Sequence, residues 1–287
     1  MPEIFEIKAR IDGLKSIHNI TYAMQIVTIS RLKRITTQLQ RLKDSQIDVQ
    51  RMLGKFLAED ERFNKTFFAK TIDPEKKPLY VLFFSNRGFC GSFNQDIYNT
   101  FLQDCQASQL SPGAVDVIGI GKKASVILKD PTAKFFAPEK DLFTVQETQA
   151  PLALISSYVN GGHPVRFVFF RFKSIISQKI VIEQLFPFEP SSFTEYMTRT
   201  KPIFVEPSLP EAEKDMLEIF LRILLLRSIQ DSASSEFSQR FLLMKSAVDS
   251  VKSLLDELHL QLNKERQRMI TQEILEIIST FNVLQKK

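Results

Sequence analysis

The sequence predicts an α/β protein: a long antiparallel coiled coil of N- and C-terminal helices with an inserted α/β domain. Both ends of the 287-residue chain carry apolar residues at alternating spacings of three and four, the pattern of a coiled-coil seam. The middle instead alternates short apolar runs, typical of buried strands, with helical segments. The expected boundaries are an N-terminal helix over 1–60, an α/β domain over 61–207 and a C-terminal helix over 208–287.

The N-terminal helix is expected from about Pro2 to the high fifties, because no later proline interrupts this stretch. At 1.5 Å per residue it would be roughly 80 Å long. Its seam turns polar at His18, Thr21, Gln25 and Thr28, while apolar residues shift to Ile17, Ile20, Met24 and Val27. This shift predicts either a twist of the rod or a surface turned toward another protein. Elsewhere the seam consists of Ile4, Ile7, Ile11, Leu14, Leu32, Ile35, Leu39, Leu42, Val49, Leu53 and Phe56.

The inserted domain is expected to begin after Asp73, Pro74 and Pro78 end the first helical region. Strands are expected at 79–84, 115–120, 165–172 and 178–186, and helices up to about 108, from 122, and near 145–159. This order predicts parallel pairing with right-handed crossovers, and hence a small doubly wound sheet.

The C-terminal helix is expected to start near Ser208, its predicted N-cap, after breaks at Pro202, Pro207 and Pro210. No proline or glycine follows before Leu284, so a continuous helix would be roughly 115 Å long. Its seam consists of Phe237, Phe241, Met244, Val248, Val251, Leu255, Leu258 and Leu262. Because neither apolar seam can be left in water, the two terminal helices are expected to pair with each other.

Composition narrows the class of protein. The net charge of +5 and the pI near 9.1 show a mild excess of positive charge. Spread over a long rod, this excess is more typical of a solvated surface than of a nucleic-acid patch, so nucleic-acid binding is not expected. Two cysteines, Cys90 and Cys105, are too few for a disulfide framework and favour a reducing compartment. No apolar run reaches the roughly 18 residues that a membrane span needs. The seam already begins at Ile4, so no targeting segment is expected before it.

No catalytic constellation is found, and no cofactor or metal is expected. The turn Gly119-Ile-Gly-Lys-Lys123 follows a strand, yet Asp116 stands where a P-loop needs its first glycine and Lys123 where it needs Ser or Thr. A tight βα turn is the simpler interpretation. Cys90 has no histidine close in sequence and is interpreted as a small packed residue. The histidines and cysteines show no metal-ligand spacing.

The densest polar pattern is Asn263-Lys-Glu-Arg-Gln-Arg-Met-Ile-Thr-Gln-Glu273, which interrupts the apolar seam. It is either a solvated helix face or a surface that hydrogen-bonds to another subunit.

This segment resembles the "NKxRQxxITxEL" signature of the gamma subunit of F-type ATP synthase. Ser235-Glu236, Arg240 and Met244-Lys-Ser-Ala247 are similar to the preceding helix of that family. Residues 10–34 resemble its first helix, 87–91 its "RGLCG" loop, and 118–123 its "IGKKG" turn. The resemblance spans the whole chain in order. Tyr22 and Thr28-Ile29 depart from the family pattern of Lys and Ala-Ala.

The resemblance implies a Rossmann-like inserted domain and a non-catalytic subunit, the central rotor shaft of a proton-translocating ATP synthase. The expected partners are the alpha and beta subunits, the epsilon subunit and the membrane ring of c subunits. The expected location is peripheral, on the cytoplasmic side of the bacterial inner membrane or on an organellar inner membrane. By the same resemblance, Met24, Arg240, Arg266, Gln267 and Thr271 would contact the beta subunit. Without it, a coiled-coil scaffold protein is the main alternative, and a small-molecule enzyme that uses the α/β domain is a third.

Overall fold

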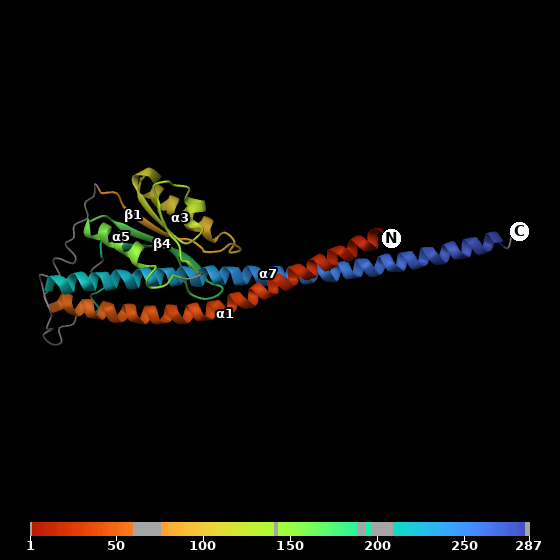
Figure 1. Cartoon of the computed structure of the whole chain (residues 1–287), viewed down its shortest axis with the longest axis horizontal. Helices are drawn as coiled ribbons and strands as arrows, with labels where there is room; N and C mark the ends of the chain where they lie inside the picture. Colours follow the sequence, from red (N-terminus) through yellow and green to blue (C-terminus); the bar gives the residue numbers. More distant parts are fainter. Residues whose placement is uncertain are drawn as a thin grey trace. The chain divides into compact units, whose positions relative to one another are not determined.

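A computed structural model describes residues 2–59, 76–140, 143–188, 193, 195–196 and 209–284. The elements are α1 (Pro2–Glu59), β1 (Leu79–Phe83), α3 (Phe93–Ala107), η1 (Pro112–Ala114), β2 (Asp116–Ile120), α4 (Ala124–Leu128), β3 (Lys134–Phe136), α5 (Gln149–Asn160), β4 (Val165–Phe172), β5 (Gln178–Phe186) and α7 (Leu209–Leu284) (Figure 1). They form two compact units, one of Met1–Thr28 with Phe241–Lys287 and one of Ile29–Arg240. The fold-class prediction is confirmed.

The expected helix-ending residues Asp73 and Pro74, the breaks at Pro202 and Pro207, and the cap Ser208 all lie outside the described residues. Pro210 does not break the chain, because it lies in the first turn of α7, where proline is tolerated. The boundaries predicted near residues 60 and 208 adjoin the same undescribed segments and stay predictions.

The sheet of the 29–240 unit has the strand order β3-β2-β1-β4-β5. β1 pairs in parallel with β2 and β4, and β2 with β3. The prediction of parallel pairing throughout is wrong at the edge, where β4 and β5 pair antiparallel. Their connection is a short hairpin, whereas a parallel pair needs a crossover of a dozen or more residues.

Two further elements differ from the sequence prediction. The three-residue strand β3 (Lys134–Phe136) was not expected, because so short a run carries no readable alternation. Helix α5 begins at Gln149 rather than near Val145. Pro151 lies in its first turn, the position that proline favours in a helix.

Both faces of the sheet are buried. Tyr80 and Leu82 of β1 pack in one core with side chains of α3 and α4. The alternate residues Val81 and Phe83 pack in a second core with side chains of α1, α5 and α7. This alternation is the period of two of a strand. It explains why all five residues of β1 are buried and why the sequence shows a continuous apolar run.

Within the 29–240 unit, α1 and α7 pair antiparallel (Figure 1). Near the end of α1, Leu53 packs in the same core as Leu217. In its middle, the Gln46 side chain accepts a hydrogen bond from Arg227 at 2.8 Å. Earlier still, Leu32 packs in one cluster with Phe237. Lower residue numbers in α1 thus pair with higher residue numbers in α7, so the predicted helix pairing is confirmed here.

The other unit, of 1–28 with 241–287, carries its own buried seam: Ile11, Thr21, Thr28, Met244, Val248, Val251 and Leu262. The hydroxyls of Thr21 and Thr28 each donate to the carbonyl four residues earlier, at 2.6 Å, so their burial leaves no donor unpaired. Ile17, Ile20 and Val27 are 51%, 63% and 51% exposed. The polar residues therefore stay in the seam, which favours an outward-facing surface over a twist of the rod.

Candidate functional site

The predicted partner-binding patch lies on α7 in the unit of 1–28 and 241–287. Arg266, Gln267 and Thr271 are all exposed. Gln267 and Thr271 share a helix face, and the Thr271 hydroxyl donates to the Gln267 carbonyl at 2.9 Å. Arg268 instead makes an ion pair with Glu265 at 2.9 Å. The side chains of Arg266 and Gln267 thus present guanidinium and amide groups to solvent.

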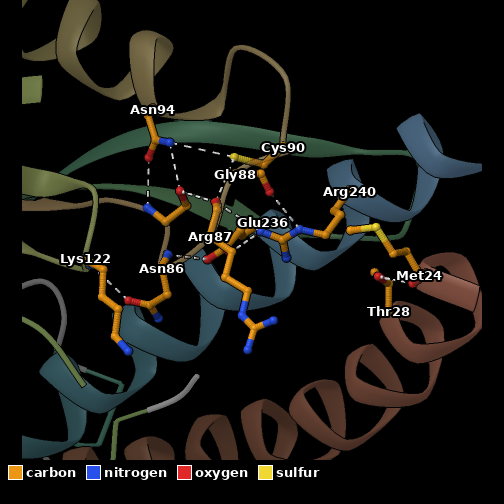
Figure 2. Close-up of polar contacts among 11 residues, drawn as sticks. Met24, Thr28, Asn86, Arg87, Gly88, Cys90, Asn94, Lys122, Glu236 and Arg240 are labelled. Carbon is orange, nitrogen blue, oxygen red and sulfur yellow. Dashed lines mark hydrogen bonds and ion pairs between the residues drawn. The ribbon is translucent and has the colours of Figure 1, made fainter. Parts of the chain in front are cut away.

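Met24 belongs to the same unit, on α1, and is half-buried. Its carbonyl accepts the hydrogen bond of the Thr28 hydroxyl (Figure 2). A half-buried methionine leaves part of a flexible, polarizable side chain available to a partner.

Arg240 belongs to the other unit and lies about seven helical turns before Arg266 in α7. It is 4% exposed. Its guanidinium contacts the Glu236 carboxylate at 2.5 Å and donates to the carbonyl oxygens of Gly88 at 3.1 Å and Arg87 at 3.3 Å (Figure 2). It also lies over the Phe237 ring, 5.0 Å from the centroid. These contacts within the chain account for the burial of its charge.

The loop that Arg240 binds is held from its other side as well. The backbone amide of Asn86 donates to Glu236 at 3.3 Å, and the Asn86 side chain accepts from the backbone amide of Lys122 at 3.1 Å. Asn94 pairs with both the amide and the hydroxyl of Ser85, at 2.8 Å each (Figure 2). The loop is therefore fastened to α7, to the second βα turn and to α3 (Phe93–Ala107).

Phe89 lies at the exposed part of this loop, with 71% of its surface in solvent and a φ of 59°. Left-handed backbone is unfavourable for a side chain of this size. Cys90, next to it, is 3% exposed, and burial raises the pKa of its thiol. The interpretation of Cys90 as a packed residue is confirmed.

Two carboxylates are buried among the described side chains of α7 in this unit. Burial raises the pKa of Glu236, against the opposing charge of Arg240. Burial likewise raises the pKa of Asp231, against Lys43 and Arg227. The Asp231 carboxylate accepts from the Phe172 amide at 3.2 Å and lies 3.5 Å from Arg227. It thereby joins β4 (Val165–Phe172) to α7.

The glycine turn at 119–123 is explained by close packing. A Cβ on Gly121 would lie 2.3 Å from the Phe84 carbonyl oxygen, and one on Gly119 would lie 2.7 Å from the Ala124 side chain. The amides of Gly121, Lys122 and Lys123 donate to Phe136, Asn86 and Ser85. A phosphate-binding loop needs such amides for its ligand, whereas here they are used within the fold. In the described part of the chain, no cluster of metal-ligating side chains is found.

Sequence reasoning missed Glu236 as the partner of Arg240 and did not connect either residue to the loop at 86–88. The spacing of four on a helix was the available signal for the ion pair. The contact with the loop had no local signal, because it joins residues about 150 positions apart.

No described helix carries an apolar stretch long enough to cross a membrane.

Comparisons with known proteins agree with this architecture. The ATP synthase family model matches residues 3–284. The ATP synthase gamma chain of Clostridium kluyveri is 30% identical over 95% of each chain, and that of Bacteroides fragilis is 27% identical over 97% of this chain and 98% of its own.

Among solved structures, the rotor of the Euglena gracilis mitochondrial ATP synthase matches 94% of this chain and 99% of its own, with a TM-score of 0.63 and 20% identity. A chain of the central stalk and c-ring of the Tetrahymena thermophila enzyme matches 79% and 99%, with a TM-score of 0.60 and 23% identity. At such identities the likeness concerns the fold. The family match over nearly the whole length decides the relationship: the chain belongs to the ATP synthase gamma-chain family, which forms the central stalk of F-type ATP synthase.

Proposed function

We propose that this chain is the rotating shaft that couples ion flow through a membrane ring of c subunits to nucleotide chemistry at the beta subunits. The helix pair would lie in the bore of the hexamer of alpha and beta subunits, and the α/β domain would bind the epsilon subunit and the ring. The chain would be peripheral, on the cytoplasmic side of a bacterial inner membrane. Different contacts at each rotor angle would favour different beta conformations, as a switching element requires.

The observation that carries the proposal is the exposure of Arg266, Gln267 and Thr271 on one stretch of α7. An exposed guanidinium and amide can form charge-assisted hydrogen bonds with a partner, each worth about 1.5 to 3 kcal/mol. If such bonds form at only some rotor angles, they bias which beta conformation is occupied. Half-buried Met24 would add an apolar contact.

Arg240 would act differently from the other four residues, because its guanidinium is used within the chain. We assign it a positioning role: it holds the loop at 86–88, next to the exposed Phe89. The exposed loop, rather than Arg240 itself, would then meet the beta subunit.

The chain would have no catalysis of its own. This is supported by the backbone amides of the glycine turn, which serve the fold instead of a phosphate, and by the absence of a P-loop Ser or Thr at Lys123.

The deciding experiment is alanine substitution of Arg266 and Gln267 together. Membrane vesicles should retain the full subunit content, since the buried seam is untouched, but should lose most ATP synthesis driven by a proton gradient. The matched control is the pair Lys252→Ala and Gln261→Ala, which are exposed on the same helix outside the patch. Normal synthesis in the patch variant would show a merely solvated face, and loss of the catalytic subunits from the membrane would show a role in assembly instead.

A further inference from the structure

A cavity of about 670 Å³ opens within the 29–240 unit, between α1, α7 and the described residues Lys140, Phe143, Thr144 and Val145. This volume lies in the range of roughly 300 to 1,000 Å³ that is usual for small organic ligands. The proposed coupling function does not use this cavity. Its apolar lining consists of Ile35, Leu42, Phe143, Val145, Leu226 and Phe237.

The charged side chains of the described lining are all cationic. Arg34 and Arg41 of α1 and Lys140 line it, and all three are exposed enough to bring their charges to its rim. None of the lining residues that the structure describes carries a carboxylate. Glu147, two residues after Val145, instead accepts the backbone amides of Glu139 at 2.7 Å and Thr144 at 2.6 Å. The described lining therefore combines an apolar wall with an excess of positive charge.

Gln230 adds a buried polar group to this lining. It is 7% exposed, and its side-chain Oε1 has no hydrogen-bond partner in the described structure. A buried acceptor without a donor is costly, so a ligand that brings an N–H or O–H group to Gln230 would remove that cost.

We propose that this cavity binds an amphipathic anion, a carboxylate on an acyl chain that also carries a hydrogen-bond donor. The acyl chain would lie against Leu226 and Phe237, the carboxylate would meet Arg34 and Arg41, and the donor would reach Gln230. The proposal stands on the cavity alone and does not depend on the coupling function.

N-decanoylglycine carries all three features and serves as the probe. The chain contains no tryptophan, and Val145 on the rim is 55% exposed. A Val145→Trp variant of the full-length chain therefore provides a single fluorescent reporter at the cavity. We expect a saturable spectral shift at concentrations below micelle formation, together with a rise in the melting temperature of the wild-type chain, which needs no substitution.

Charge and hydrogen bonding are tested separately. The methyl ester of the probe, and the Arg34→Gln/Arg41→Gln variant, should each weaken binding at least tenfold. The control Lys33→Gln, exposed on α1 and not part of the lining, should leave it unchanged. Gln230→Leu should weaken the binding of N-decanoylglycine severalfold and leave that of decanoate, which lacks the amide, unchanged.

Two outcomes would overturn the proposal. Equal binding of acid and ester would show nonspecific adsorption to apolar surface. Cosedimentation with phosphatidylglycerol vesicles, without saturable binding of the monomeric probe, would show that these cations meet a bilayer surface rather than a ligand in the cavity.

Discussion

At the scale of the residue, the buried ion pair between Arg240 and Glu236 joins α7 to the loop at 86–88. Both are nearly fully buried, and an isolated buried charge would be unstable. The pair persists because backbone groups complete its hydrogen bonding: the carbonyl oxygens of Arg87 and Gly88 accept from Arg240, and the amide of Asn86 donates to Glu236. The geometry of the loop and the charge on the helix therefore depend on each other.

Arg240→Ala should lower the free energy of unfolding by about 3 to 5 kcal/mol, because it leaves Glu236 as an uncompensated buried charge. Urea denaturation gives the value. Arg222→Ala is the matched control: it breaks an ion pair of the same spacing with Glu218 on the same helix, but at side-chain exposures of 31% and 47%. That control should cost less than about 1 kcal/mol, and equal costs for the two variants would contradict the assigned role of burial.

Asp231 allows a test of pH dependence. Burial raises the pKa of its carboxyl group, so the folded state binds a proton at pH values where the unfolded state, with a pKa near 3.9, has lost it. Stability from this group then falls as pH rises through that window. Relative to Asp231→Asn, the wild-type chain should gain stability as pH is lowered from about 7 toward 4. Thermal melts of both proteins give the difference, and the opposite slope would mean that Lys43 and Arg227 dominate and lower the pKa.

At the scale of the element, the terminal helices owe their pairing to seam positions rather than to the average character of their surfaces. In the unit of 1–28 and 241–287, Val251 is 7% exposed, whereas Leu254 on the same helix is 46% exposed. The two residues are similarly apolar, so only their position in the repeat of three and four separates them. Thr21 and Thr28 follow the same rule, because position places them in the seam although they are polar.

Val251→Asp should destabilise the subunit by about 2 to 3 kcal/mol, because it buries a charge without a partner. Leu254→Asp introduces the same charge at an exposed position and should change stability by less than about 0.5 kcal/mol. Circular dichroism melts of the two variants make the comparison. A melting temperature for Val251→Asp equal to that of the wild type would argue against burial of this seam.

At the scale of the whole molecule, one chain combines two long terminal helices with a mixed sheet that is attached to α7. The sheet is joined to α7 by the amide of Phe172, which donates to Asp231, and by the clamp between the loop at 86–88 and Arg240. Its glycine turn, which in other α/β proteins would bind phosphate, is closed by the carbonyls of Phe136 and Ser85. The fold therefore uses its strand ends for attachment.

The purified chain should accordingly show no specific binding of Mg-ATP. Isothermal titration calorimetry should give no saturable heat at micromolar to millimolar nucleotide. The isolated beta subunit under the same conditions is the positive control. Saturable micromolar binding of Mg-ATP by the chain would contradict this account.

The sequence alone determined the two helices, four of the five strands that the structure describes and the position of the exposed polar patch, because these depend on local period and spacing. Val165–Phe172 and Gln178–Phe186 were predicted at their observed bounds. Tertiary structure decided the rest. The antiparallel β4-β5 edge, the burial of Arg240 and the cationic cavity each depend on which segments meet in space.

Arg240 and Arg266 look alike in sequence, because both are basic residues of one helix. Arg240 is nevertheless buried under a loop that lies about 150 residues earlier in the chain, whereas Arg266 lies in solvent. Local pattern carries no information about such partners, because the free energy of burying a charge depends on what surrounds it.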